Sequence, residues 1–180
     1  NDEQQLDQVA TVSFRTATSQ AILRDVARSL TRQGIRRLLI LNAHGGNEFK
    51  PLVRDLQSEF ARDELLIIVA NFYQLIPDVV ADLFDEPGDH AGELETSLML
   101  HLHPELVAMD QAGLGERKPF AISSLRQPGV WTPRPWSRCH PDTGSGDPRP
   151  ATEEKGRRYF EALTGVVSKI LCEVADTGKS

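Results

Sequence analysis

The stretch LLILNAHGGN, residues 38–47, decides the fold of this 180-residue chain. Its run of apolar residues is typical of a strand that is covered on both faces. The strand leads directly into a turn in which Gly45 and Gly46 follow His44, and glycine lets the backbone turn sharply because it has no Cβ. Ligands and catalytic groups collect at such strand ends in open α/β sheets. We therefore expect His44 to project into a site.

The patterns on either side of this stretch predict a parallel sheet. Apolar residues recur at helical spacing over 16–33, and Gly34 stands where a helix C-cap belongs. Residues 35–41 predict a strand, residues 49–60 a helix, and residues 65–70 a second apolar strand. This order is typical of a right-handed parallel βαβ unit. The sequence therefore predicts an α/β fold with a mainly parallel sheet flanked by helices.

The rest of the chain combines helical patterns with one long irregular segment. Helices are predicted over residues 78–84, over 93–103 where Pro104 stops the helix, and over 152–174. Residues 111–150 are rich in proline and glycine, and a loop of that length is usually functional or disordered. The length of the chain suits a single domain over residues 1–180.

Composition excludes several classes of partner. The apolar content of 39% and the charged content of 26% describe an ordinary globular protein, and the net charge of −6 argues against nucleic acid. The sequence shows no membrane-spanning apolar run and no signal-peptide pattern, so we expect no membrane partner. Cys139 and Cys172 are far apart, which favours reduced thiols in a cytoplasmic protein over a disulfide framework.

The helix predicted over 93–103 carries two acids on different faces. At about 100° per residue, Leu98, Met99 and Leu102 lie within roughly 60° of Glu95, whereas Glu93 points nearly opposite. We therefore expect Glu95 to lie in the buried stripe and Glu93 to face water. A buried carboxylate is costly unless it is paired, protonated or bound to a metal.

His44 and Glu95 are the candidate metal ligands. Imidazole and carboxylate together suit a divalent ion such as zinc, manganese or iron. Two ligands do not complete a site, so at least one more protein ligand is needed. A single buried histidine is more often a core residue, but its glycine turn together with a buried acid favours the ligand interpretation. Asp89 and His90 start the same helix, and such a pair suits proton transfer beside a metal.

The irregular segment contributes further candidates. Trp131 and Trp136 either wall a substrate pocket or pin the loop to the surface, and the sequence favours neither interpretation. Adjacent Cys139 and His140 lack a second ligand pair and so give little support for a metal site. Three arginines of this segment, Arg134, Arg138 and Arg149, either contact an anionic substrate or lie on a solvated loop face, which is the default.

At these residues the sequence resembles the creatininase (creatinine amidohydrolase) family. Residues 42–47, Asn-Ala-His-Gly-Gly-Asn, resemble the family's Asn-Gly-His-Gly-Gly-Asn turn, and residues 89–97, Asp-His-Ala-Gly-Glu-Leu-Glu-Thr-Ser, resemble its His-Ala-Gly…Glu-Thr-Ser segment. Residues 144–156 carry Gly-Ser-Gly-Asp-Pro, then Ala-Thr and Lys-Gly, which resemble its closing Gly-x-Gly-x-Pro…Ala-Thr…Lys-Gly signature. The resemblance spans nearly the whole chain.

The resemblance implies a creatininase-like fold, a centre of one or two metal ions, and a homo-oligomer, commonly a hexamer. The implied reaction is hydrolysis of a C–N bond in a small-molecule amide or cyclic amide by metal-activated water. In it, His44 and Glu95 belong to the ligand set, and His90, steadied by Asp89, carries a proton to the departing nitrogen.

The sequence departs from the family pattern in two places. Family members carry a Glu-x-His segment and a following Asp ahead of the present region, so the ligand set is incomplete and we expect residues 1–180 to represent the C-terminal two-thirds or more of such a domain. Gly45 and Gly46 replace bulkier residues and a carboxylate of creatinine-hydrolysing members, which argues against creatinine as substrate. The alternatives are a catalytically inactive scaffold or fragment, and a phosphate-binding module that uses the Gly45-Gly46 turn.

Overall fold

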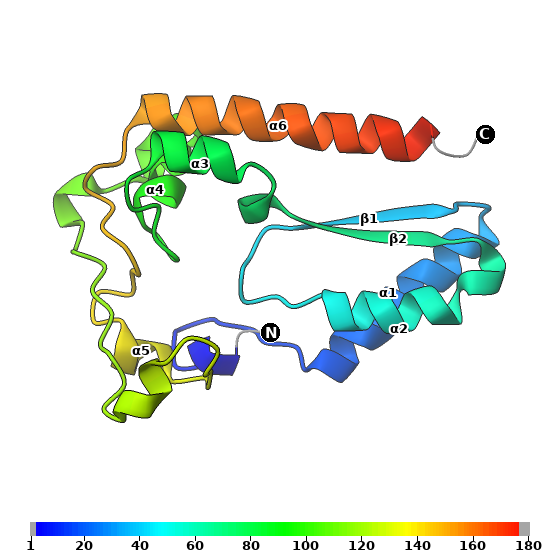
Figure 1. Ribbon diagram of the computed structural model, residues 1–180, viewed down its shortest axis with the longest axis horizontal. Coiled ribbons are helices and arrows are strands. Elements are labelled where there is room, and N and C mark those ends of the chain that lie inside the picture. Colours follow the sequence, from blue (N-terminus) through cyan, green and yellow to red (C-terminus); the bar gives the residue numbers. More distant parts are fainter. Residues whose placement is uncertain (1–2, 177–180) are drawn as a thin grey trace. The chain divides into compact units, whose positions relative to one another are not determined.

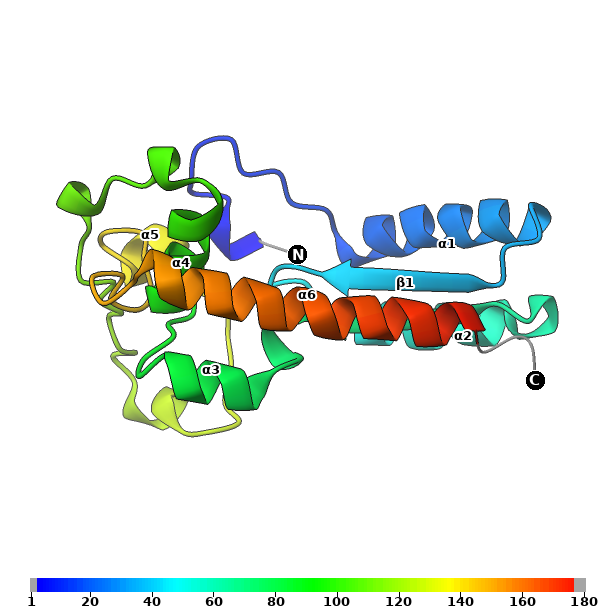
Figure 2. The same ribbon diagram turned by 90° about the horizontal axis from the view of Figure 1, so that it is seen from above.

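The computed structural model describes residues 3–176 of the chain (Figure 1 and Figure 2). Contacts within the chain divide it into two compact units. Of the described residues, Glu3, 12–76 and 165–176 belong to unit 1, whereas 4–11 and 77–164 belong to unit 2. A single domain over residues 1–180 stays a prediction.

Unit 1 contains the predicted strand–helix–strand element. Helix α1 (Thr16–Arg32) precedes strand β1 (Arg37–Asn42), and helix α2 (Lys50–Glu59) connects β1 to strand β2 (Leu66–Asn71). The strands are parallel and in register from Arg37 opposite Leu66 to Asn42 opposite Asn71. Figure 1 shows α1 and α2 on the same side of the two strands. The predicted parallel sheet flanked by helices is confirmed.

The core of unit 1 lies between these helices and one face of the sheet. Its buried members, with partly buried side chains packed against them, are Ala27, Leu56, Phe60, Leu65, Ile67, Leu23, Leu38, Ile40 and Val53. Side chains alternate between the faces of a strand, so Leu41 and Leu66 point to the other face, where they are 48% and 43% exposed. Cover on that other face is uneven, since Ala70 there is only 7% exposed.

Unit 2 is built from helices and the long irregular segment. Its helices are α3 (Pro77–Leu83), α4 (Glu93–Leu102), the short α5 (Trp136–Cys139) and the first part of α6 (Glu153–Asp176), which continues into unit 1. Helix α4 ends just before Pro104, as predicted.

Short 3-10 turns along the chain are Glu3–Gln5, Ala61–Asp63, Phe72–Gln74, Pro104–Leu106, Met109–Gln111 and Ser123–Arg126. Within residues 3–176, no helix has the length and apolar character needed to cross a membrane.

Helices α4 and α6 cross at very short range within unit 2. A Cβ at Gly156 of α6 would overlap the carbonyl oxygen of Ser97 in α4, so only glycine fits. The Ser97 side chain is fully buried, and its hydroxyl accepts a hydrogen bond of 3.1 Å from the backbone N–H of Thr152. The first turns of α6 therefore lie directly against α4.

We expect Gly156→Ala to lower the free energy of unfolding by roughly 1–3 kcal/mol, because the added methyl forces the two helices apart. Urea unfolding followed by circular dichroism measures the change. Gly165→Ala is the matched control, since a Cβ at Gly165 of the same helix meets nothing within 4 Å. There the better helix propensity of alanine should add about 0.5–1 kcal/mol of stability. Equal effects at both positions would contradict the close crossing.

Candidate active site

Three glycines bring two loops of unit 2 into backbone contact. A Cβ at Gly88 would lie 2.8 Å from the Cα of Gly92, and one at Gly146 would lie 2.5 Å from the Cα of Gly88. Gly88 and Gly146 also have positive φ angles, 80° and 122°. Side chains are excluded at these positions, so the turn before α4 is held tightly against residues 144–146.

Backbone hydrogen bonds fix Asp89 and His90 between these glycines. The carbonyl oxygen of Ser145 accepts the N–H groups of Asp89, at 2.7 Å, and of His90, at 3.1 Å. The N–H of Ser145 donates in return to the carbonyl oxygen of His90 at 2.8 Å, which completes an isolated antiparallel bridge. The position of His90 is therefore set by main-chain contacts.

The imidazole of His90 lies against a buried aromatic stack. Its ring centroid is 5.2 Å from that of Trp136, with the rings nearly perpendicular at 83°. Trp136 stacks on His140 at 3.9 Å and donates its indole N–H to the carbonyl oxygen of Thr143 at 2.9 Å. The Nδ1 of His140 lies 3.1 Å from the carbonyl oxygen of Gly144. The stack gives the His90 ring a rigid support.

The surroundings of His140 keep its imidazole neutral near pH 7. Burial lowers the pKa of His140 below 6.5; the hydrogen bond to Gly144 opposes this, and the nearby charges of Arg117 and Arg134 lower the pKa further, with Asp89 opposing them. Neutral His140 then donates its Nδ1–H to the carbonyl oxygen of Gly144.

Asp89 and both tryptophans line one cavity of unit 2. The cavity has a volume of about 230 Å³. Trp136 forms a buried wall at 8% exposure, whereas Trp131 is 78% exposed. Within residues 3–176 no hydrogen bond joins the Asp89 carboxylate to the His90 ring, so the orienting role of Asp89 stays a prediction.

The predicted burial of the two acids of α4 is wrong. Glu93 is only 1% exposed and forms an ion pair with the ammonium group of Lys155 in α6. Glu95 is half-buried. The acid that is enclosed and paired is therefore Glu93, and its partner is an amine of the protein.

The error arises from the choice of the buried face. The periodicity correctly placed the acids on different faces, but the side of α4 that meets α6 carries Leu94 and Ser97. Met99 and Leu102, which mark the apolar stripe, are 37% and 40% exposed. The close approach at Gly156 buries a mixed polar face in preference to the apolar one.

Glu95 points back to the turn that follows His90. Its Oε2 accepts the N–H of Ala91 at 2.6 Å, which satisfies a donor just ahead of the helix.

Tyr159 of α6 is fully buried, and its hydroxyl has no hydrogen-bond partner within residues 3–176. Burial raises the pKa of Tyr159 to about 12, with a smaller contribution from the charge of Glu95.

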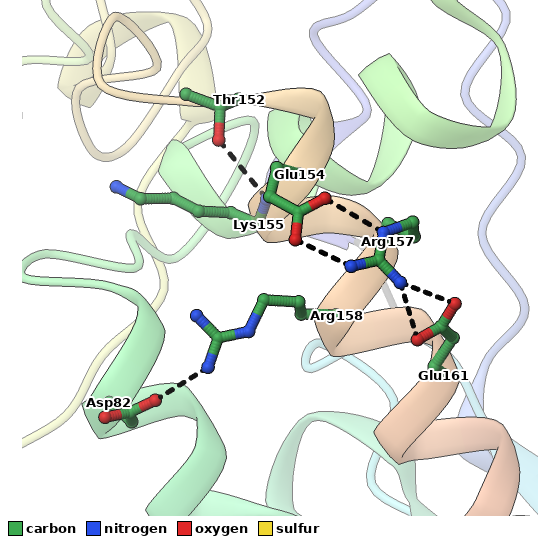
Figure 3. Close-up of polar contacts among 7 residues, drawn as sticks. All are labelled: Asp82, Thr152, Glu154, Lys155, Arg157, Arg158 and Glu161. Atoms are coloured by element: carbon green, nitrogen blue, oxygen red, sulfur yellow. Dashed lines mark hydrogen bonds and ion pairs between the residues drawn. The ribbon is translucent and has the colours of Figure 1, made fainter.

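The exposed side of the same turns of α6 carries a separate set of ion pairs (Figure 3). Arg157 binds Glu154 at 2.6 Å and Glu161 at 2.8 Å, and Arg158 binds Asp82 of α3 at 3.1 Å. Pairs in contact with water contribute little to stability. Of these ion pairs, the Glu93–Lys155 pair is the one with an enclosed carboxylate, and it joins α4 to α6.

His44 lies in unit 1 at the end of β1, as predicted. Its Nδ1 accepts the N–H of Gly46 at 3.0 Å. Asn42, only 2% exposed, shapes the turn because its amide donates to the carbonyl oxygen of Asn47 at 3.1 Å and to the side chain of Asn71 at 2.9 Å. The paired asparagines at the ends of both strands hold the turn that carries His44.

The described residues do not complete a metal site. His44 belongs to unit 1 and Glu95 to unit 2. Their donor types fit a divalent ion, but residues 3–176 contain no group of three or more His, Cys, Asp or Glu side chains arranged to hold one. The predicted roles of His44 and Glu95 as ligands stay predictions.

Sequence reasoning missed two residues of these sites. Asn71 ends the second apolar run just as Asn42 ends the first, and this repetition was an available signal. Arg117, which lines the cavity beside Asp89, lies in the irregular segment and had no local pattern to single it out.

Comparison with known proteins places this arrangement in a family. The model of the family described as creatininase, creatinine amidohydrolase, matches residues 2–171. A mycofactocin precursor peptide peptidase from Mycobacterium ulcerans (strain Agy99) is 32% identical over 166 residues, which cover 89% of this chain and 58% of the relative. The chain therefore spans less than two thirds of that peptidase's length.

Solved structures agree with this result. A protein from Bacteroides fragilis NCTC 9343, assigned as a creatinine amidohydrolase, is 44% identical with a TM-score of 0.85 over 94% of this chain and 66% of its own. A manganese form of creatininase is 27% identical with a TM-score of 0.73, covering 91% and 66%. A mutant creatininase of the Zn-Zn type is 26% identical with a TM-score of 0.70 over the same shares.

We expect the stability of the protein to fall as the pH decreases through and below 6.5. The pKa of His140 is lower in the folded than in the unfolded chain, so the unfolded state takes up a proton first. Urea unfolding at pH 7.5 and at pH 5.5 measures the difference. His140→Asn removes this contribution and should reduce the pH dependence. An unchanged dependence in the variant would contradict the lowered pKa.

Proposed function

The chain belongs to the creatininase family, and from that premise we propose that it is part of a metal-dependent hydrolase of C–N bonds in small-molecule amides or cyclic amides. The observation that supports the proposal most is the fixed position of His90, held by Ser145 through the backbone and by Trp136 through its ring. A general acid or base needs such a defined position at the reacting atoms.

Each candidate residue has a proposed role in this reaction. His90 delivers a proton to the departing nitrogen of the amide, and Asp89 steadies its imidazole in the loaded enzyme. His44 and Glu95 would help to hold a divalent metal such as zinc, manganese or iron, in a centre of one or two ions that other ligands complete. When bound, the metal would supply Lewis-acid stabilisation of charge on the carbonyl oxygen. Trp131 and Trp136 flank the substrate.

The relatives support the bond type and leave the substrate open. A peptidase and a creatinine amidohydrolase share one reaction, the hydrolysis of an amide C–N bond. A mutant creatininase 27% identical to this chain is complexed with creatine, a small molecule. Gly45 and Gly46 offer no side chain to contact a substrate. We therefore propose an amide other than creatinine.

The assembly and location are proposed by analogy with the family. We propose that the protein forms a homo-oligomer in the cytoplasm, and a hexamer is the assembly to test first. Free Cys139 and Cys172 support a reducing compartment. Size-exclusion chromatography with light scattering determines the mass of the assembly.

An inactive scaffold is the second candidate, and one observation favours it. Residues 3–176 contain no group of three ligands that would hold a metal ion. Elemental analysis beside an intact-mass measurement separates the two candidates. Stoichiometric metal favours the hydrolase, whereas metal-free protein favours the scaffold. The phosphate-binding alternative loses support because Gly45 and Gly46 precede the start of α2 at Lys50 and do not form its N-terminus.

We expect dialysis of the active protein against a chelator to abolish amide hydrolysis, because the proposed reaction depends on a divalent ion. Addition of Mn²⁺ or Zn²⁺ should restore it. Release of amine from a panel of small amides measures the activity. Full activity in protein shown to be metal-free would overturn the metal-dependent mechanism.

We expect His90→Asn to lower kcat on the order of 100-fold or more, because it removes the group that carries the proton. His103→Asn is the matched control, since His103 lies just beyond the end of the same helix and pairs with Glu105 in an exposed position. Its kcat should stay near that of the unmodified protein. Near-normal turnover in His90→Asn would remove His90 from the proposed role.

A further inference from the structure

We infer that the cavity beside Asp89 binds a carboxylate group of the substrate, which makes the substrate an amide that carries a negative charge. This inference rests on the proposed function and names its substrate class. The cavity is lined by both tryptophans, two arginines and two further titratable residues: Trp131, Trp136, Arg117, Arg134, Asp89 and His140. Asp89, the chain neighbour of His90, and Trp136, against which the His90 ring lies, both line the cavity, so a bound anion would lie near the proposed site of proton transfer.

The charge of the cavity favours an anion. Arg117 and Arg134 each contribute a positive charge, and Asp89 contributes one negative charge. Buried His140 adds none near pH 7, as its environment disfavours the protonated form. A net positive cavity attracts a single carboxylate and rejects a cationic ligand.

The two arginines differ in how they are held. The Nη1 of Arg134 donates to the carbonyl oxygen of Lys118 at 3.0 Å, and its guanidinium lies 3.9 Å above the ring of Phe120. Arg134 is thus fixed in place, with donors left over. Arg117 forms no hydrogen bond or ion pair within the part of the chain that the structure describes. Two guanidinium groups, one held in place and one whose donors are all available, suit the two oxygens of a carboxylate.

The other arginines of the irregular segment do not compete for this role. Arg138 is exposed and does not line the cavity. Arg149 is occupied by Asp147, through a 2.9 Å bond from its Nε and a 2.6 Å bond from its Nη2. Of the three arginines that the sequence offered for an anionic substrate, only Arg134 reaches the cavity, and Arg117 joins it.

The aromatic walls add a requirement for a planar group. The indole N–H of Trp136 is already bound to Thr143, so this ring offers only its apolar surface to a ligand. Trp131 is 78% exposed at the same cavity and loses water contact when a planar group packs on it. The combination of ring surface and two guanidinium groups fits an amide that carries both a planar group and a carboxylate.

Tryptophan fluorescence of the whole chain tests the inference without metal or turnover. The probes are N-benzoylglycine, which carries a carboxylate, and N-benzoylglycinamide, its neutral counterpart of the same shape. We expect the carboxylate to bind about tenfold or more tightly, and Arg117→Gln to abolish that preference. Arg138→Gln is the matched control and should retain it.

The outcomes separate this inference from the proposed function. Equal binding of the two probes by the unmodified protein, or an unchanged preference in Arg117→Gln, overturns the carboxylate site. Preference for the carboxylate that depends on Arg117 supports the site even where no amide is hydrolysed, and in that case the hydrolase proposal alone fails.

Discussion

The buried ion pair between Glu93 and Lys155 is the interaction on which the candidate active site depends. Glu93 is 1% exposed, and a carboxylate so enclosed is tolerated only with a partner of opposite charge. The partner reaches it because Gly156 lets α6 approach the backbone of Ser97. Helix α4 begins just after His90, so the pair that anchors α4 also anchors the turn that carries the candidate catalytic residues.

The turn itself is held by a different means. Gly88, Gly92 and Gly146 remove every side chain from the place where two loops meet, and Ser145 then bonds the backbone of His90 on both its carbonyl and its N–H side. The glycines of the closing sequence signature therefore have a steric role, whereas its lysine has an electrostatic one. The aromatic stack and the arginines surround a site whose main chain is already fixed.

The sequence was sufficient to predict where the main helices and strands lie, but not which face of α4 is buried. The periodicity of α1 and α6 and the apolar runs of β1 and β2 are local properties, so their positions could be predicted to within a few residues. Burial of Glu93 depends on Lys155, 62 residues further along the chain. No local pattern reports such a contact, and the apolar stripe pointed to Glu95. Arg117 and Arg134 likewise line one cavity although they are separated in the sequence, and no local pattern predicts this.

A double-mutant cycle on Glu93→Gln and Lys155→Met tests most directly whether the buried pair holds α4 to α6. The free energy of unfolding is measured by urea titration for the unmodified protein, both single variants and the double variant. A coupling of roughly 1–3 kcal/mol is expected, in the range of residues that share one buried contact. A coupling below about 0.5 kcal/mol, the level of ordinary surface pairs, would contradict the claim that this pair anchors the site.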